Sequence, residues 1–296
     1  MTGGDESQSE TGGRPDEAHE LLGRQLRLLR EAGGVTPTAA GRHIGGSASK
    51  ISRIECGRCK VKEDDLHRLL NLYGGTDRRH RQALLEFAGR LAGGQWWDGY
   101  RDVVDDWFRS YLVLESIAQV IRTYEVRFIP GLLQTRAYAE AVVRRQYHDE
   151  KEVRRRVEVR MRRQHAVIER KKPHLWAVID RAALDEAALP DGIAGPAVMR
   201  EQIEFLRTAA EQPNVVIQIL PPGAGGRVGI ATSFSLLRMS GIPDVAYIEH
   251  IGDALFLDRP DKADRYAIAM NRLGVEAGEP QDAKATLEES LADIPG

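Results

Sequence analysis

SASKISR, residues 47–53, predicts a short helix with one apolar and one polar edge. Ser47 can cap this helix, because a serine hydroxyl accepts a hydrogen bond from the unpaired N–H groups of the first turn. Ile51 and Ile54 fall on the same side and are expected to face inward. The residues left on the outward edge are Ala48, Ser49, Ser52 and Arg53. This edge therefore presents short side chains and one guanidinium group.

Two more helices are expected before this one. The first carries an apolar stripe at positions i, i+4 and i+7, formed by Leu22, Leu26 and Leu29. The second can be capped by Thr36, with Pro37 at its first position, and is expected to run to Ile44. Two amphipathic helices joined by a tight glycine turn form a helix-turn-helix, whose second helix presents its N-terminal residues to the major groove of DNA.

The pattern supplies candidate DNA contacts. Bases are expected to be read by the outward edge of residues 48–53, with Arg53 suited to a bidentate contact with guanine. Phosphate contacts are expected from Thr36, Thr38, Arg42, Lys50 and Arg58. Residues 20–60 contain eight basic and three acidic residues, a local charge of +5, although the whole chain carries −2. The alternative is a solvated helical domain that happens to carry arginines.

Residues 22–61 resemble the lambda repressor and Cro-like (Xre-type) regulators. The resemblance lies in the Leu-Arg-x-Leu-Arg-Glu opening and in the Ile-Ser-Arg-Ile-Glu-x-Gly-Arg core. The chain departs from that family at Pro37, where glutamine is usual, and at Ala40, Gly41 and Gly46, where the side chains are usually larger. Because Pro37 lacks the amide, and small side chains at Ala40 and Gly46 leave space between helices, we expect weaker intrinsic DNA affinity and looser packing.

At 296 residues the chain is long enough for two domains. It has no apolar run of membrane-spanning length and only two cysteines, so a reducing cytoplasm, close to the nucleoid, is the expected compartment. We expect a disordered lead at 1–19, an all-α helix-turn-helix domain of about five helices at 20–91, a larger α+β regulatory or partner-binding domain at 92–276, and a flexible tail at 277–296.

The α+β class rests on alternating patterns after residue 92. Runs of strand length and β-branched composition occur at 120–125, 175–180, 215–220, 234–239, 245–249 and 255–257. Helical periodicity occurs at 135–146, 149–171, 196–211 and 260–273. A mixed, partly antiparallel sheet is therefore expected. The glycine-rich stretch 221–226 is interpreted as a hairpin loop, because it has no lysine-serine ending for a phosphate cradle.

A second resemblance covers about 95–275. The motifs IPGLLQT at 129–135, RMRRQ at 160–164, PNV at 213–215 and YIE at 247–249 are similar to the C-terminal domain of unknown function in actinobacterial WhiJ-like and antitoxin-like Xre regulators. The resemblance implies a transcriptional regulator whose large domain binds a small partner protein. The chain departs from it at Arg181, where an acidic residue is common, and at 225–229, near the usual Gly-x-His-Pro-Gly.

Three further features have open interpretations. The basic segment 151–172 is either a solvated helix face or a surface for an acidic partner or effector, through Arg155, Arg156 and Arg163. Trp107 belongs to an aromatic cluster that either lines a ligand pocket or simply packs. Cys56 and Cys59 form C-x-x-C, which is either a redox switch, half of a zinc site or simply the end of the helix and the following turn. A structural zinc site needs four ligands and no second cysteine pair exists, so no metal is expected.

These patterns favour a sequence-specific DNA-binding transcription regulator, repressor-like and dimeric, whose second domain senses an effector or binds a partner. The alternative is an antitoxin-like protein that sequesters a cognate partner, with DNA binding as autoregulation. An enzyme is not expected, because no catalytic constellation or cofactor motif is visible.

Overall fold

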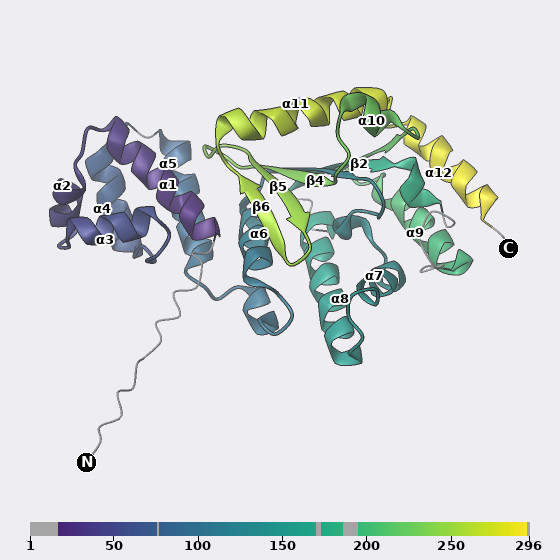
Figure 1. Cartoon of the computed structure of the whole chain (residues 1–296), viewed down its shortest axis with the longest axis horizontal. Helices are drawn as coiled ribbons and strands as arrows, with labels where there is room; N and C mark the ends of the chain where they lie inside the picture. Colours follow the sequence, from purple (N-terminus) through teal and green to yellow (C-terminus); the bar gives the residue numbers. More distant parts are fainter. Residues whose placement is uncertain (1–16, 76, 170–172, 186–194, 295–296) are drawn as a thin grey trace, which may run out of the picture. The chain divides into compact units, whose positions relative to one another are not determined.

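The structure is a computed structural model that describes residues 17–75, 77–169, 173–185 and 195–294 (Figure 1). The chain forms two compact units, Met1–Gly75 and Thr76–Gly296. Most of the expected disordered lead, residues 1–16, lies outside the described residues, and the first helix begins at Glu17. No helix in the described part of the chain is long and apolar enough to cross a bilayer.

The first unit consists of α1 (Glu17–Ala32), α2 (Pro37–His43), α3 (Ala48–Glu55) and α4 (Glu63–Tyr73). Both caps predicted from the sequence are present, because the Thr36 hydroxyl accepts from the Ala39 N–H and the Ser47 hydroxyl from the Lys50 N–H, each at 3.2 Å. The core between the helices is aliphatic and includes Leu22, Leu26, Ala40, Ile51, Ile54, Leu66, Leu69 and Leu70.

Two glycines, which have no side chain, allow the backbones of α1 and α2 to lie close to α3 and its N-cap. A Cβ atom on Gly23 of α1 would lie 2.5 Å from the carbonyl oxygens of Ile54 and Glu55, and one on Gly41 of α2 would lie 2.5 Å from the carbonyl carbon of Ser47. Ala40 beside it is fully buried. The looser packing expected at Ala40 is therefore not seen, because the helices close the space by approaching. At Gly46, the other position of that expectation, a Cβ atom would lie 2.9 Å from Cδ of Lys50, so the lysine stem occupies the space.

The second unit is built on a six-stranded mixed sheet, as predicted. Its strands are β1 (Val120–Glu125), β2 (His174–Asp180), β3 (Val215–Leu220), β4 (Phe234–Arg238), β5 (Val245–His250) and β6 (Asp253–Leu257), in the order β3-β2-β1-β4-β5-β6. β1, β2 and β3 run parallel, whereas β4, β5 and β6 pair antiparallel from β1 outward. Each of the six predicted runs is a strand, and the fold class is confirmed.

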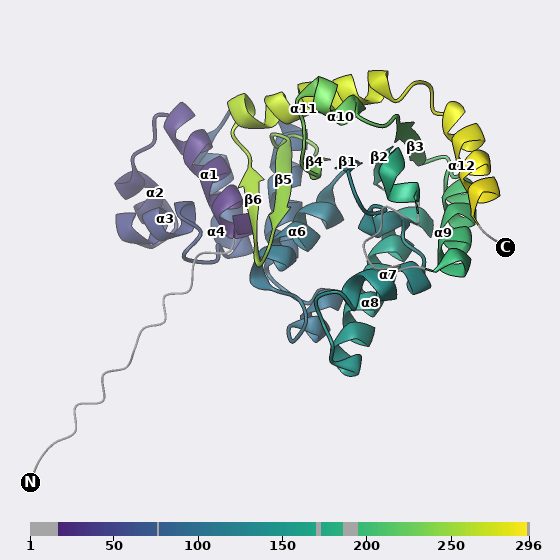
Figure 2. The same cartoon turned by 45° about the vertical axis from the view of Figure 1, so that its right-hand side comes forward.

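Helices cover both faces of the sheet. The helices of this unit are α5 (Arg78–Leu91), which packs on α6, and α6 (Asp106–Ile117), α7 (Arg136–Val143), α8 (Glu150–Gln164), α9 (Pro196–Ala209), α10 (Ala224–Val228), α11 (Pro260–Glu276) and α12 (Asp282–Asp293). Short helical turns lie at Trp96–Tyr100, Gly131–Leu133, His165–Glu169 and Arg181–Leu184. Figures 1 and 2 show α11 along one face, and α6, α7 and α8 on the other. Under α11 the core includes Tyr124, Val178, Phe234, Leu236, Met270 and Leu273.

Two sequence expectations for this unit are corrected. The stretch 221–226 is no hairpin loop, because β3 and β4 are not paired and residues 224–228 form α10 between them. Residues 277–296, expected as a flexible tail, contain α12, which packs on α9 and β3 and buries Leu287 completely. The remaining expected domain limits stay predictions, although α5 is counted here with the second unit.

Replacing Leu287 with Ala is expected to lower the free energy of unfolding of the second unit by about 3 kcal/mol, because a fully buried leucine leaves a cavity. All four tryptophans lie in this unit, so their fluorescence during denaturation measures the effect. Lys284→Ala, at an exposed position of the same helix, is the control and should change little. Equal midpoints for the two variants would contradict a packed α12.

Candidate nucleic-acid interface

The outer edge of α3 is open to solvent, as the sequence predicts. Ser49, Ser52 and Arg53 are exposed and Ala48 is half-buried, whereas Ile51 and Ile54 on the inner edge are 1 % and 3 % exposed. The side chains that could reach base edges therefore share one accessible face.

Four of the five expected phosphate contacts are exposed: Thr36, Thr38, Arg42 and Arg58. The Thr36 hydroxyl already accepts the capping bond from Ala39, so its own proton stays available as a donor. Lys50 differs from these four, because its ammonium group donates to the Asp65 carboxylate at 2.6 Å. The structure thus places Lys50 in an ion pair between α3 and α4.

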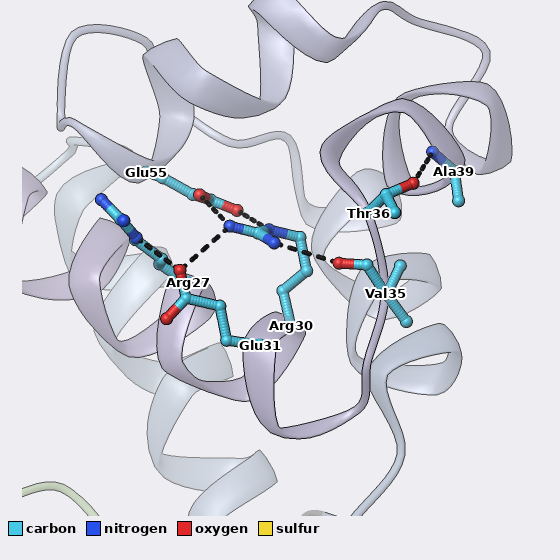
Figure 3. A network of polar contacts seen from close by, with 7 residues as sticks. All are labelled: Arg27, Arg30, Glu31, Val35, Thr36, Ala39 and Glu55. Atoms are coloured by element: carbon cyan, nitrogen blue, oxygen red, sulfur yellow. Dashed lines mark hydrogen bonds and ion pairs between the residues drawn. The ribbon is translucent and has the colours of Figure 1, made fainter.

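A buried ion pair, Arg30 with Glu55, joins α1 to the end of α3 (Figure 3). The guanidinium donates from Nε to Oε1 at 2.6 Å and from Nη2 to Oε2 at 2.9 Å, and a third bond reaches the Val35 carbonyl at 3.0 Å. Both side chains are 8 % exposed. The hydrogen bond to Glu55 raises the pKa of Arg30, and burial, with the Glu55 charge, raises that of Tyr73 to about 12.

This pair corrects the charge argument made from the sequence. Arg30 was counted among the basic groups available to phosphate, yet it is buried and neutralised. The other two arginines of α1 are also paired, Arg27 with Glu31 at 2.8 Å and Arg24 with Glu20 at 3.3 Å. Exposed pairs of this kind attract phosphate weakly, because each carboxylate cancels its arginine. The positive charge of α1 is thus largely balanced inside the first unit.

Six exposed arginines and lysines in the described part of this unit have no carboxylate partner: Arg42, Arg53, Arg58, Lys60, Lys62 and Arg68. They all follow Gly41, on α2, α3, α4 and the segment between α3 and α4. The sequence window 20–60 missed Lys62 and Arg68 and overstated α1. The pairing of Arg24 and Arg27 could have been predicted from the sequence, because each has an acidic residue four positions away on the same helix.

Cys56 and Cys59 directly follow α3. Cys56 is the exposed C-cap residue of α3, and the half-buried Cys59 thiol donates to the Lys60 carbonyl at 3.5 Å. Among the described residues, no group of three histidine, cysteine or acidic side chains is arranged to hold a metal ion. Within the described residues, the two cysteines therefore have no further side chain arranged with them as a metal ligand.

Three arginines of the basic helix α8 bond to carboxylates within the second unit. Arg155 donates to both carboxylate oxygens of Asp102 at 2.7 and 2.6 Å, and Arg156 donates to Glu152 at 2.9 Å while lying over the Tyr147 ring. Arg163 is 8 % exposed and donates to both oxygens of Glu115 at 2.9 and 2.7 Å. Residues 170–172 of the predicted basic segment lie outside the described residues.

Trp107 belongs to the aromatic packing around this pair. Its ring lies 5.6 Å from that of Phe108, which stacks on Tyr111 at 5.8 Å. The Arg163 guanidinium lies over both Phe108 and Tyr111. The structure therefore brings Trp107 and Arg163 into one cluster, and burial of Arg163 removes it from any surface that a partner could touch.

Glutamine side chains hold the IPGLLQT loop at residues 129–135, a role that the sequence did not predict. Gln202 of α9 accepts from the Thr135 N–H at 2.8 Å and donates to the Leu133 carbonyl at 2.7 Å. Gln164 of α8 donates to the Leu132 and Gln134 carbonyls at 3.2 and 2.8 Å. These amides hold the loop that follows β1, together with Arg160 of α8, which donates to the Gln134 side-chain oxygen.

Comparison with known families agrees with this division. Residues 108–289 match the model of a family described as Domain of unknown function (DUF5753), which covers more than half of the chain. The chain belongs to this family. Residues 21–84 match the model of a Helix-turn-helix domain. No curated protein and no solved structure gives a significant match. The DUF5753 match includes all six strands, and the helix-turn-helix match includes most of α1, all of α2, α3 and α4, and part of α5.

Replacing Arg30 with Ala is expected to lower the free energy of unfolding of the first unit by about 3 kcal/mol, because Glu55 would stay buried without its partner. Far-ultraviolet circular dichroism measures the loss of the first unit, while tryptophan fluorescence follows the second unit. Arg27→Ala removes an exposed arginine from the same helix and should leave the transition nearly unchanged. A similar small effect of both substitutions would show that the buried pair does not stabilise the unit.

Replacing Arg163 with Ala is expected to destabilise the second unit by about 3–5 kcal/mol, because Glu115 loses both bonds in a buried site. Denaturant titration followed by tryptophan fluorescence is the measurement. Arg154→Ala, at an exposed position of the same helix, serves as the control. If Arg163→Ala unfolds like the control, the arginine is not a structural residue.

Proposed function

We propose that the chain is a sequence-specific DNA-binding transcription regulator of the lambda repressor and Cro-like type. The observation that carries the proposal is the exposed polar edge of α3, beside unpaired cations on neighbouring elements of a helix-turn-helix domain. In this proposal Ala48, Ser49, Ser52 and Arg53 read base edges. The phosphate contacts come from Thr36, Thr38, Arg42 and Arg58, which orient the domain on the duplex.

A homodimer is part of the proposal, because one short reading helix distinguishes only a few base pairs. Dimers of this motif place two helices in successive major grooves, about 34 Å apart. Footprinting on the promoter of the protein's own gene cluster tests both points. Protection of two related half-sites, absent on random DNA, is the expected result. No discrimination between the promoter and random DNA would overturn the function.

For the DUF5753 unit we propose a regulatory role, in which it binds an effector or a small partner protein and thereby alters DNA binding in the cytoplasm. Its size, its separate core and the implied resemblance support this role. Stoichiometric co-purification of a neighbouring gene product would favour the antitoxin-like alternative, with DNA binding as autoregulation. A metabolite that changes DNA affinity would favour effector sensing.

Replacing Arg53 with Ala is expected to cost about 1–3 kcal/mol of operator binding and to relax specificity at one base pair. Gel-shift titrations with the operator and with single-base variants measure both effects. Arg68→Ala removes the same charge from an exposed position of α4 outside the reading edge, and should leave the base preference intact. An equal loss of affinity on every sequence after Arg53→Ala would make Arg53 a phosphate contact instead.

A further inference from the structure

The ion pair between Lys50 and Asp65 stands apart from the other charges around the reading helix. Lys50 lies in the first turn of α3 and Asp65 in the first turn of α4, and Nζ is 2.6 Å from Oδ2. The Lys50 side chain is 29 % exposed and that of Asp65 only 11 %. The pair therefore lies at the edge of the candidate interface, with its anionic half turned inward.

Local structure keeps Lys50 in this position. A Cβ atom on Gly46 would lie 2.9 Å from Cδ of Lys50, so the glycine provides the space in which the lysine stem lies. The first turn of a helix disfavours a cation and favours an anion. Lys50 is thus in an unfavourable field without its partner, whereas Asp65 is in a favourable one.

Pairing changes what Lys50 contributes to DNA binding. A cation binds phosphate mainly by releasing counterions from the duplex, and each contact adds about 0.9 to the slope of log affinity against log salt. The Lys50–Asp65 pair has no net charge and therefore releases no counterions from the duplex. For Lys50 to bind phosphate, the mostly buried Asp65 carboxylate would lose its partner.

We propose that Asp65 is a positioning residue of the DNA-binding site, which holds Lys50 as a neutral pair and so keeps sequence-independent binding weak. The proposal rests on the proposed DNA-binding function and replaces the expectation from the sequence that Lys50 holds a phosphate. Recognition then depends more on the reading edge and on cations such as Arg42 and Arg58.

The test compares two neighbouring aspartates in the full-length chain. Asp65→Asn is expected to raise affinity for operator and random DNA about three- to tenfold at 0.1 M salt, and to steepen the salt slope by about 0.9, because Lys50 becomes a phosphate contact. Asp64→Asn removes the same charge from an exposed neighbour in the same helical turn and should change affinity less than about twofold. Equal effects of both substitutions would overturn the proposal.

Lysine substitutions provide the second readout and do not depend on the stability of the Asp65 variant. In the wild-type background, Lys50→Gln should lower affinity and salt slope clearly less than Arg58→Gln, which removes an unpaired cation. In the Asp65→Asn background the two substitutions should become equally harmful. If Lys50→Gln matches Arg58→Gln in the wild-type background, Lys50 breaks its pair on DNA and the proposal is wrong.

These outcomes separate the inference from the proposed function. Wild-type protein that binds DNA without preferring its promoter would overturn sequence-specific regulation, while the aspartate comparison could still be read on any duplex. Wild-type protein that binds no DNA would overturn both. Circular dichroism of each variant confirms that the first unit is folded before titration.

Discussion

The position of α3 against α1 depends on the buried ion pair between Arg30 and Glu55. Arg30 lies on α1 and Glu55 is the last residue of α3, and the same guanidinium also bonds the Val35 carbonyl just before α2. One side chain therefore ties together three helices of the motif. At the same place Gly23 lets the two backbones approach, so that the pair is short and shielded. Since the inner edge of α3 is fixed in this way, its outer edge with Ser49, Ser52 and Arg53 stays exposed to solvent.

The same interaction explains why counting basic residues misjudged the charged surface. Three arginines of α1 raise the local charge of the sequence, but each has a carboxylate within 3.5 Å in the folded unit. Two of those carboxylates lie four residues away on the helix, whereas Glu55 is 25 residues away from Arg30 and cannot be found by periodicity. The unpaired cations lie on the later elements instead. An electrostatic attraction to DNA would therefore act close to α3 and would orient the domain with its reading edge forward.

Sequence patterns predicted the elements well because those elements are specified locally. Caps at Thr36 and Ser47 and the six strand runs follow from rules that involve neighbouring residues. What failed depends on tertiary contacts. The burial of α12 requires α9 and β3 to be in place, and the glycine-rich stretch before β4 became a helix because β4 pairs with distant β1. In the candidate site, the exposure of Ser49, Ser52 and Arg53 was predictable from α3 alone, whereas the pairing of Lys50 with Asp65 needed α4 beside it.

In the second unit, too, arginines that look available in the sequence are neutralised by carboxylates in the folded structure. Helix α8 has the composition of a binding surface, but three of its arginines bond carboxylates: Arg155 bonds Asp102, Arg156 bonds Glu152 and Arg163 bonds Glu115. The Arg163 guanidinium also lies over two aromatic rings within the core. A guanidinium held by two carboxylate bonds is a poor group for recruiting an acidic partner, because binding must first break those bonds. The neighbouring IPGLLQT loop is held by the amides of Gln202 and Gln164 and also by Arg160 of α8, which donates to the Gln134 side chain. Arg155, Arg156 and Arg163 of the helix and the amides around the loop are thus engaged in bonds within the DUF5753 unit.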